Sequence, residues 1–287
     1  MPDGIAIVRD GHKTWLKWHR GRKQAGDLPF TGERIVEGMR LGASVEVDLR
    51  RHAEGGFAVL HDETLDRSTT GTGLVAARTR AQLRALYLRD GAGNETTHHV
   101  MLLEDLAALL GEAGVEEGAL LQLDLKESIE TLGPAEVAGF AEAVGPLARH
   151  MILSGGDPAA IALLADVAPG ILTGYDPSDE ERFMAMAAAG DIKDFLDGFV
   201  EDAVRAAPDV DFIYLYWEIV TRSADAGFDI IDAFHKHGKR VDAWTLNTTD
   251  ATTVAVAERL LALKVDQITT DDPAGLEAAL NPATSQV

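Results

Sequence analysis

The 287-residue sequence predicts a (β/α)8 barrel, or TIM barrel, as one domain spanning residues 1–287. Short apolar runs alternate with longer segments of helical periodicity, which is typical of parallel sheets built from βαβ units. Eight such strands can be counted, and single barrels of this kind commonly contain about 250 residues. Polar candidate residues fall at the ends of several strands, where barrels of this class carry their functional groups.

The first part of the chain contains two short strands joined by an Asp-Gly turn, followed by His19-Arg20-Gly21. The further elements expected here are a helix over 31–41, strands over 45–50 and 57–60, and helices over 79–87 and 101–112. Residues 64–73 are too rich in Gly and Thr for a helix, and the stretch containing His98 and His99 is expected to be a polar loop. Residues 52–100 are therefore predicted to be an insertion after the second barrel strand.

The remainder of the chain alternates strand and helix with little ambiguity. The expected strands cover 119–126, 150–154, 171–175, 212–216, 240–245 and 267–270. The expected helices cover 134–148, 157–167, 179–206, 224–237 and 249–263, with a last one after Pro273. Together with the strands that end at His19 and at Arg50, this gives the eight strands of the barrel.

The net charge limits the classes of molecule that the protein is expected to bind. The chain carries 26 Lys and Arg against 47 Asp and Glu, a formal net charge of −21, which on average repels nucleic acid and anionic membrane surfaces. An anionic small-molecule substrate would need a local positive site made by a metal or by clustered Arg and Lys. The sequence has no apolar run of 18 residues and no signal-peptide pattern at its start, so we expect no membrane span and a cytoplasmic protein.

The stretch Val45–Arg50 alternates apolar and charged residues, the pattern of a strand with two different faces. Glu46 and Asp48 are two residues apart, so they share a face, and such close carboxylates repel unless a cation lies between them. Asp124 and Lys126 repeat the arrangement with one carboxylate and one cation. A divalent cation site is one interpretation, and a solvated acidic face is the other.

With these residues in order, the chain resembles the glycerophosphodiester phosphodiesterase family. The resemblance covers residues 19 to 273, nearly the whole chain, and its motifs occur in the family's order. The matching motifs are His19-Arg20-Gly21, Gly42-Ala43 before Glu46-x-Asp48, His61-Asp62, Leu65-x-Arg67-x-Thr69-x-Gly71, Asp124-Leu125-Lys126, Ala243-Trp244-Thr245-Leu246-Asn247 and Val265-Asp266-x-Ile268-x-Thr270-Asp271-x-Pro273. Each motif is weak alone, and the ordered set is specific.

The resemblance implies a metal-dependent enzyme that hydrolyses a small glycerophosphodiester to an alcohol and glycerol 3-phosphate. Its implied metal ligands are Glu46, Asp48 and Asp124, and oxygen ligands without cysteine suit Mg²⁺ or Ca²⁺. The nucleophile in this family is water or the neighbouring hydroxyl of the glycerol.

The resemblance also assigns roles to residues around the phosphate. Arg20 and Lys126 would bind the phosphate oxygens, and Trp244 would form an apolar wall beside the glycerol. His19 and His61 would act as the acid–base pair, one accepting a proton from the nucleophile and the other donating one to the leaving alkoxide.

Two positions depart from the family pattern. Members usually carry Pro-Glu-Asn-Thr before the first helix, where this chain has Leu28-Pro29-Phe30-Thr31, and the register does not place Glu33 at the missing glutamate. Asp124 stands where the family has glutamate, which is conservative for a metal ligand. The altered first loop raises a second hypothesis, a phospholipase D-like lyase that releases a cyclic phosphate. A third is an inactive barrel that binds a phosphorylated ligand.

Three further residues allow two interpretations each. Asp62 orients His61 or caps the following turn, and Trp244 lines the site or belongs only to the barrel core. Asp271, at the end of the last strand, is expected to shape the barrel rim rather than to act in the chemistry.

Overall fold

The computed structural model describes residues 2–178, 180–189 and 192–281. The chain divides into two compact units: the first comprises residues up to 19, 23–25 and from 173 onward, and the second comprises residues 20–22 and 26–172. Eight strands pair in parallel within the units: β2, β12, β11, β10 and β9 in the first, and β8, β7 and β3 in the second. Helices alternate with these strands, and the predicted (β/α)8 barrel class is confirmed.

The second unit carries the acidic strand predicted from the sequence. Its elements are α1 (Gly32–Leu41), β3 (Ser44–Arg51), β4 (Phe57–Val59), α2 (Arg80–Arg84), β5 (Tyr87–Arg89), β6 (Glu95–His99), α3 (Leu103–Ala113), β7 (Leu120–Leu125), α4 (Pro134–Val144), β8 (Met151–Gly155) and α5 (Pro158–Ala165). Gly42 ends α1 in the left-handed conformation, with φ 79°, and its N–H donates to the Gly38 carbonyl. The chain then turns directly into β3, whose Asp48 lies opposite Asp124 of β7.

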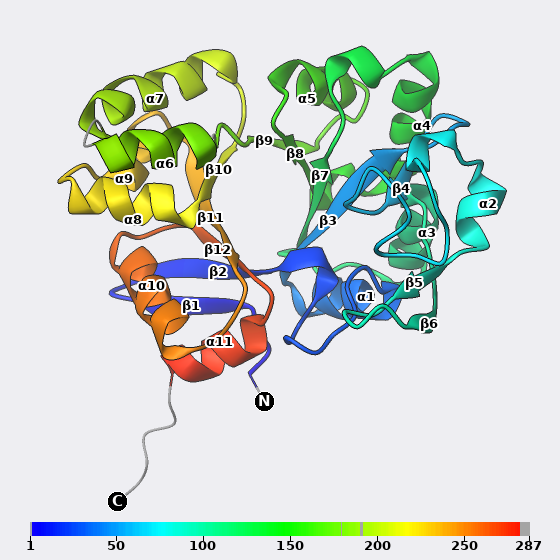
Figure 1. The fold of residues 1–287 in the computed structure, drawn as a ribbon, viewed down its shortest axis with the longest axis horizontal. Helices are drawn as coiled ribbons and strands as arrows, with labels where there is room; N and C mark the ends of the chain where they lie inside the picture. The colour runs from blue at the N-terminus through cyan, green and yellow to red at the C-terminus, as the bar shows by residue number, and fades with distance from the viewer. Residues whose placement is uncertain (1, 179, 190–191, 282–287) are drawn as a thin grey trace, which may run out of the picture. The chain divides into compact units, whose positions relative to one another are not determined.

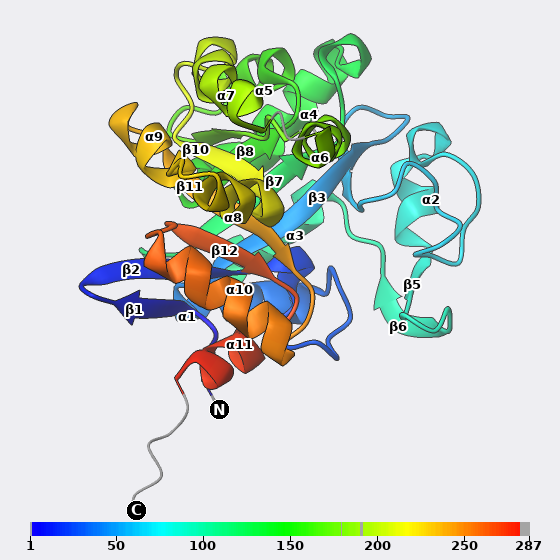
Figure 2. The same cartoon turned by 60° about the vertical axis from the view of Figure 1, so that its left-hand side comes forward.

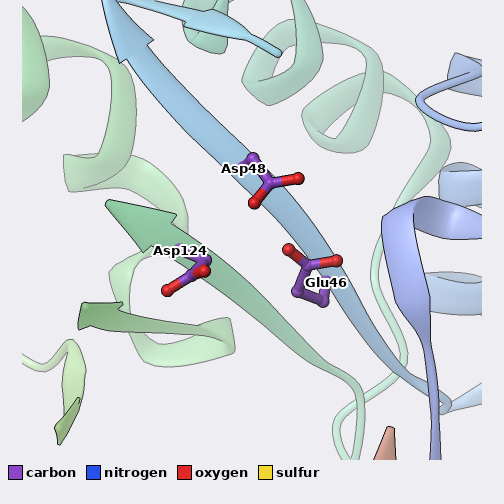
Figure 3. Close-up of side chains that lie close together, drawn as sticks. All are labelled: Glu46, Asp48 and Asp124. Carbon is purple, nitrogen blue, oxygen red and sulfur yellow. The ribbon is translucent and has the colours of Figure 1, made fainter. Parts of the chain in front are cut away.

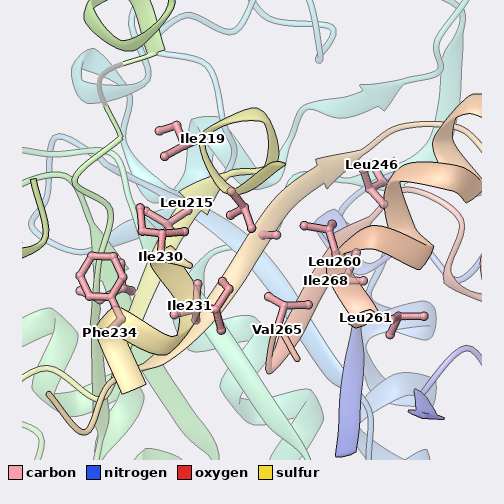
Figure 4. Close-up of a cluster of buried hydrophobic side chains, with 14 of the residues drawn as sticks. Leu215, Ile219, Ile230, Ile231, Phe234, Leu246, Leu260, Leu261, Val265 and Ile268 are labelled. Atoms are coloured by element: carbon pink, nitrogen blue, oxygen red, sulfur yellow. The ribbon is translucent and has the colours of Figure 1, made fainter. Parts of the chain in front are cut away.

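The first unit is built from the two ends of the chain. Its elements are β1 (Ala6–Arg9), β2 (His12–Trp18), β9 (Leu172–Tyr175), α6 (Glu180–Ala189), α7 (Ile192–Ala206), β10 (Phe212–Tyr216), α8 (Trp217–Asp225), α9 (Ile230–Lys236), β11 (Arg240–Leu246), α10 (Ala251–Ala262), β12 (Gln267–Thr270) and α11 (Pro273–Leu280) (Figure 1). Leu215 and Ile268 of the strands pack against buried side chains of the covering helices, among them Phe234 and Leu260 (Figure 4). Burial of such side chains is the main favourable term in folding.

Two details of the sequence prediction are wrong. Residues 95–99 form strand β6, paired antiparallel with β5, rather than a polar loop. Both strands lie on the side of the unit that carries α2 (Figure 1, Figure 2), and no side chain of β6 is buried, so β6 lacks the apolar alternation that marks a strand. The helix expected over 224–237 is two helices, α8 and α9, separated at Gly227 with φ 79°. The helical region expected over 179–206 is helical throughout its described residues, as α6 and α7, and residues 179 and 190–191 of this prediction lie outside the described residues.

A buried ion pair lies among the strands of the first unit. The Lys17 ammonium is 3.0 Å from the Asp242 carboxylate, and both side chains are at most 1% exposed. Thr269 donates a hydrogen bond to the same carboxylate, and the Tyr214 ring lies 4.3 Å from the ammonium. The pair therefore has the additional polar and π contacts that a buried charge requires.

Replacing Asp242 with asparagine leaves the Lys17 ammonium buried without its counter-charge. We expect the free energy of unfolding, measured by urea denaturation, to fall by about 3–5 kcal/mol. Asp232→Asn is the matched control, because it removes the partner of Lys236 in an exposed pair on α9, and it should leave the unfolding midpoint nearly unchanged. Equal midpoints for the two variants would show that the buried pair contributes nothing specific.

Candidate active site

Three carboxylates from two neighbouring strands meet in the second unit. Glu46 and Asp48 lie on β3 and Asp124 on β7, and one oxygen of each lies within 4.8 Å of the others (Figure 3). Glu46 and Asp48 are buried, with relative exposures of 4% and 1%. The period-two spacing on β3 and the parallel register with β7 bring the side chains to one point, as the sequence predicted.

Two cations contact this cluster. The Lys126 ammonium lies 3.1 Å from Asp48 Oδ1 and is ion-paired with Asp124. The Arg20 guanidinium donates from Nε to Asp48 Oδ2 at 3.1 Å, and the Arg20 backbone N–H donates to Glu46 Oε2 at 2.7 Å. The structure thus brings Arg20 and Lys126 to the three carboxylates, as the resemblance implied for residues of one site.

The backbone conformation of Arg20 makes its double contact possible. Arg20 has φ 55° and ψ 33°, a left-handed conformation that is uncommon for a residue with a side chain. Gly21 follows with φ 71°, and a Cβ at Gly21 would lie 2.7 Å from Cγ1 of Ile35. Glycine is therefore required at the third position of His19-Arg20-Gly21 by close packing against α1.

The electrostatics of the cluster favour an added cation. Burial, and after it the charges of Asp48 and Asp124, raise the pKa of the Glu46 carboxyl to about 8, although Arg20 and Lys126 oppose them. Burial alone would lower the pKa of Lys126, but the carboxylates of Asp124 and Asp48 hold it above its ordinary value. Three converging carboxylate oxygens fit the preference of Mg²⁺ and Ca²⁺ for hard ligands.

His61 lies in the second unit with a fixed orientation. Its Nδ1 is 2.9 Å from Asp62 Oδ1, and Arg67 binds the same carboxylate through two nitrogens at 2.6 and 2.7 Å. The Arg50 guanidinium donates to the carbonyls of His61 and Lys126, at 2.8 and 2.6 Å. Of the two interpretations of Asp62, the structure supports the orienting one, because its carboxylate holds the Nδ1 edge of the His61 ring.

His19 has an equivalent partner in the first unit. Its Nδ1 lies 2.5 Å from Asp271 Oδ1, and both side chains are largely buried. We expected Asp271 to shape the barrel rim; the structure instead makes it the partner of His19. Each of the two histidines thus pairs Nδ1 with a carboxylate, an arrangement that fixes the orientation of the ring.

Trp244 lies at the end of β11 in the first unit. Its ring is half-buried, and its centroid is 5.6 Å from that of Tyr216 at the end of β10. The Tyr216 hydroxyl donates to Glu218 at 3.0 Å. Trp244 is thus not confined to the core, and Tyr216, which the sequence reasoning missed, extends the aromatic surface.

Replacing Asp62 with asparagine is expected to affect both catalysis and stability. Arg67 and then His61, through their hydrogen bonds, lower the pKa of Asp62 to about 2, against burial, from an ordinary value of 3.8. A lowered pKa contributes stability that is present above the ordinary pKa and is lost as the pH falls through the folded-state pKa. Asp62→Asn should therefore cost about 1 kcal/mol of unfolding free energy at pH 7, and less at pH 3, in urea titrations.

The same variant should lower kcat because His61 loses its orienting partner. Asp66→Asn, in the same loop, is the control and should keep kcat. A stability loss that is equal at pH 7 and pH 3 would contradict the assigned role of the Asp62 charge.

The (β/α)8 chain carries a carboxylate triad that Arg20 and Lys126 contact. It also carries two histidines that are each paired with a carboxylate. These are the kinds of group that phosphodiester chemistry needs. The model of the glycerophosphoryl diester phosphodiesterase family matches residues 19–275, and the chain belongs to this family. It is therefore an enzyme of the phosphoric diester hydrolase class that acts on glycerophosphodiesters. Within the described residues, no helix is both long and apolar enough to cross a membrane.

The chain is similar to known proteins in sequence and in fold. The chain is 27% identical over 203 residues to the probable glycerophosphodiester phosphodiesterase 1 of Mycobacterium tuberculosis, covering 64% of this chain and 68% of that protein. It resembles the crystal structure of a glycerophosphoryl diester phosphodiesterase from Parabacteroides distasonis, with TM-score 0.64, 19% identity and coverage of 96% and 89%. It also resembles an Oleispira antarctica phosphodiesterase in complex with the product sn-glycerol-3-phosphate, with TM-score 0.64, 18% identity and coverage of 93% and 96%.

Proposed function

We propose that the chain is a divalent-metal-dependent glycerophosphodiester phosphodiesterase that releases glycerol 3-phosphate and an alcohol. The observation that supports this most is the carboxylate triad of Glu46, Asp48 and Asp124, with two cations already in contact with it. In line with the sequence prediction, we also propose that residues 1–287 act as one catalytic domain in the cytoplasm, with residues 52–100 as an insertion.

The triad and its two cations would bind the phosphate. Mg²⁺ or Ca²⁺ held by the triad would supply positive charge to the phosphate oxygens, where negative charge accumulates in the transition state. The Lys126 ammonium would donate to one of these oxygens, and the Arg20 guanidinium would bind them as a planar fork. Both side chains would exchange part of their present contact with Asp48 for the substrate.

His19 and His61 would move the protons of the reaction. One imidazole accepts the proton of the attacking water at Nε2, and the other, as imidazolium, donates a proton to the leaving alkoxide. A P–O bond to water forms and the P–O bond to the alcohol breaks, so the two histidines exchange protonation states in each cycle. Asp271 and Asp62 hold the Nδ1 atoms and thereby orient the two rings. The ring of Trp244 would cover the apolar face of the glycerol.

The experiment is hydrolysis of glycerophosphocholine and glycerophosphoethanolamine with Mg²⁺, Ca²⁺ or EDTA, read by phosphorus NMR. We expect glycerol 3-phosphate to form with either metal and not in EDTA. A cyclic phosphate at early times would support the lyase hypothesis, which the altered loop at Pro29 and Phe30 motivates. Binding of the diesters without turnover in either metal would support an inactive binding barrel.

A further inference from the structure

The second unit contains a pocket of about 550 Å³ that the proposed chemistry does not use. Its wall is formed by the start of α1, by the insertion strand β6 with the segment that follows it, and by the far half of α3. Its size falls within the range of about 300–1,000 Å³ in which proteins bind drug-sized molecules. We call this cavity the Phe30 pocket.

The lining of the Phe30 pocket combines apolar side chains with two exposed glutamates. The apolar side chains are Phe30, Val36, Met101, Leu109 and Ala113. The lining also includes Glu33, whose side chain is 76% exposed, together with His98, which lies 3.6 Å from Glu33, and Glu112. The two glutamates disfavour an anionic occupant, so the pocket suits an uncharged apolar group.

Phe30 lies between this pocket and Arg20, one of the two basic residues at the triad. Its backbone N–H donates to the Arg20 carbonyl at 2.8 Å, and the Arg20 guanidinium lies 5.9 Å from the centre of its ring. Arg20 in turn contacts Asp48 of the triad. The Phe30 backbone has φ 62°, so its position is held by the surrounding packing rather than by its own preference. The side chain of Phe30 therefore lies between the pocket and a phosphodiester bound at Arg20.

The walls of the pocket coincide with the parts in which this sequence departs from the family pattern. Phe30 stands in the loop where members usually carry Pro-Glu-Asn-Thr, and His98 and His99 belong to the predicted insertion. An aromatic ring in place of a polar side chain changes the chemistry at this position from polar to apolar. The pocket is thus a place where substrate preference can differ from that of relatives.

We propose that the Phe30 pocket binds an uncharged alkyl or aryl group carried by the phosphodiester substrate. The enzyme then prefers a chain-bearing glycerophosphodiester to glycerophosphocholine. This inference rests on the proposed function for its catalytic consequence, and the binding it describes can be measured without turnover. The apolar group can be attached to the glycerol or to the leaving alcohol.

The first measurement compares kcat/KM for three substrates below their micelle concentrations. They are glycerophosphocholine, 1-O-octyl-glycerophosphocholine and the octyl ester of glycerol 3-phosphate. We expect at least about a tenfold advantage for one octyl substrate, and the favoured one shows which side of the phosphate faces the pocket. Leu109→Glu places a charge in the pocket and should remove this advantage.

The second measurement is calorimetric binding of octyl phosphocholine in EDTA, which needs no catalysis. Leu109 is 40% exposed on α3, and glutamate is a good helix former, so Leu109→Glu should remain folded. Leu74→Glu is the matched control, since Leu74 is 47% exposed in the insertion and does not line the pocket. Binding lost in Leu109→Glu and kept in Leu74→Glu supports the proposal, even if no diester is turned over and the proposed function fails.

No binding by the wild type, or equal weakening in both variants, overturns the proposal. Equal kcat/KM for the plain and the octyl substrates also overturns it, while leaving the proposed phosphodiesterase function intact.

Discussion

Replacing His61 with alanine is expected to lower kcat for glycerophosphocholine by about 10²–10⁴-fold, the usual contribution of a general acid or base. The same loss is expected for His19→Ala, because each histidine supplies one of the two proton transfers. Thermal unfolding should change little for His61→Ala, whose side chain is 37% exposed. The measurement is steady-state turnover at saturating substrate and metal, followed by the release of choline.

The control for these variants is His237→Ala. His237 closes α9 at the surface, with a side chain 35% exposed and 3.6 Å from Glu201, and it has no assigned role in the chemistry. Its removal should leave kcat unchanged. If His61→Ala or His19→Ala kept wild-type turnover, the acid–base assignment would be wrong, whatever the metal requirement.

Replacing Asp48 with asparagine is expected to have a comparably large effect, because Asp48 is the most buried member of the triad and contacts both cations. Removing its charge weakens metal binding and misplaces Lys126 and Arg20 together. We expect kcat/KM to fall by about 10³-fold or more, since several transition-state contacts are lost at once.

Metal binding gives a second readout of the same variant. A ligand present at about 100 times its Kd stabilises the folded state by about 2.7 kcal/mol, so Mg²⁺ or Ca²⁺ should raise the Tm of the wild type. Asp48→Asn should lose this rise. Glu63→Gln removes an exposed carboxylate two residues after His61 and should keep it. An unchanged Tm rise in Asp48→Asn would place the metal elsewhere.

Much of this architecture follows from the sequence for simple physical reasons. Strand β3 was predicted because apolar and charged residues alternate, and the same alternation placed Glu46 beside Asp48. The barrel class followed from the regular alternation of strands and helices. In contrast, no side chain of β6 is buried, so no hydrophobic pattern marks this strand, and it was predicted to be a loop.

Contacts between side chains that are far apart in the sequence could not be predicted from the sequence. Asp271 and His19 are 252 residues apart, and only the fold brings their side chains to 2.5 Å. The left-handed backbone of Arg20 depends on packing at Gly21 and Ile35, which no local propensity predicts. The order of the family motifs was therefore more informative for the site than any single residue pattern.

The most direct test of the account is hydrolysis of glycerophosphocholine in H₂¹⁸O, with Mg²⁺ or Ca²⁺ and in EDTA, followed by phosphorus NMR and mass analysis of both products. We predict metal-dependent formation of glycerol 3-phosphate with one ¹⁸O in its phosphate, and unlabelled choline, because water attacks phosphorus. Label in the choline, or equal turnover in EDTA, would contradict the metal-assisted attack at phosphorus.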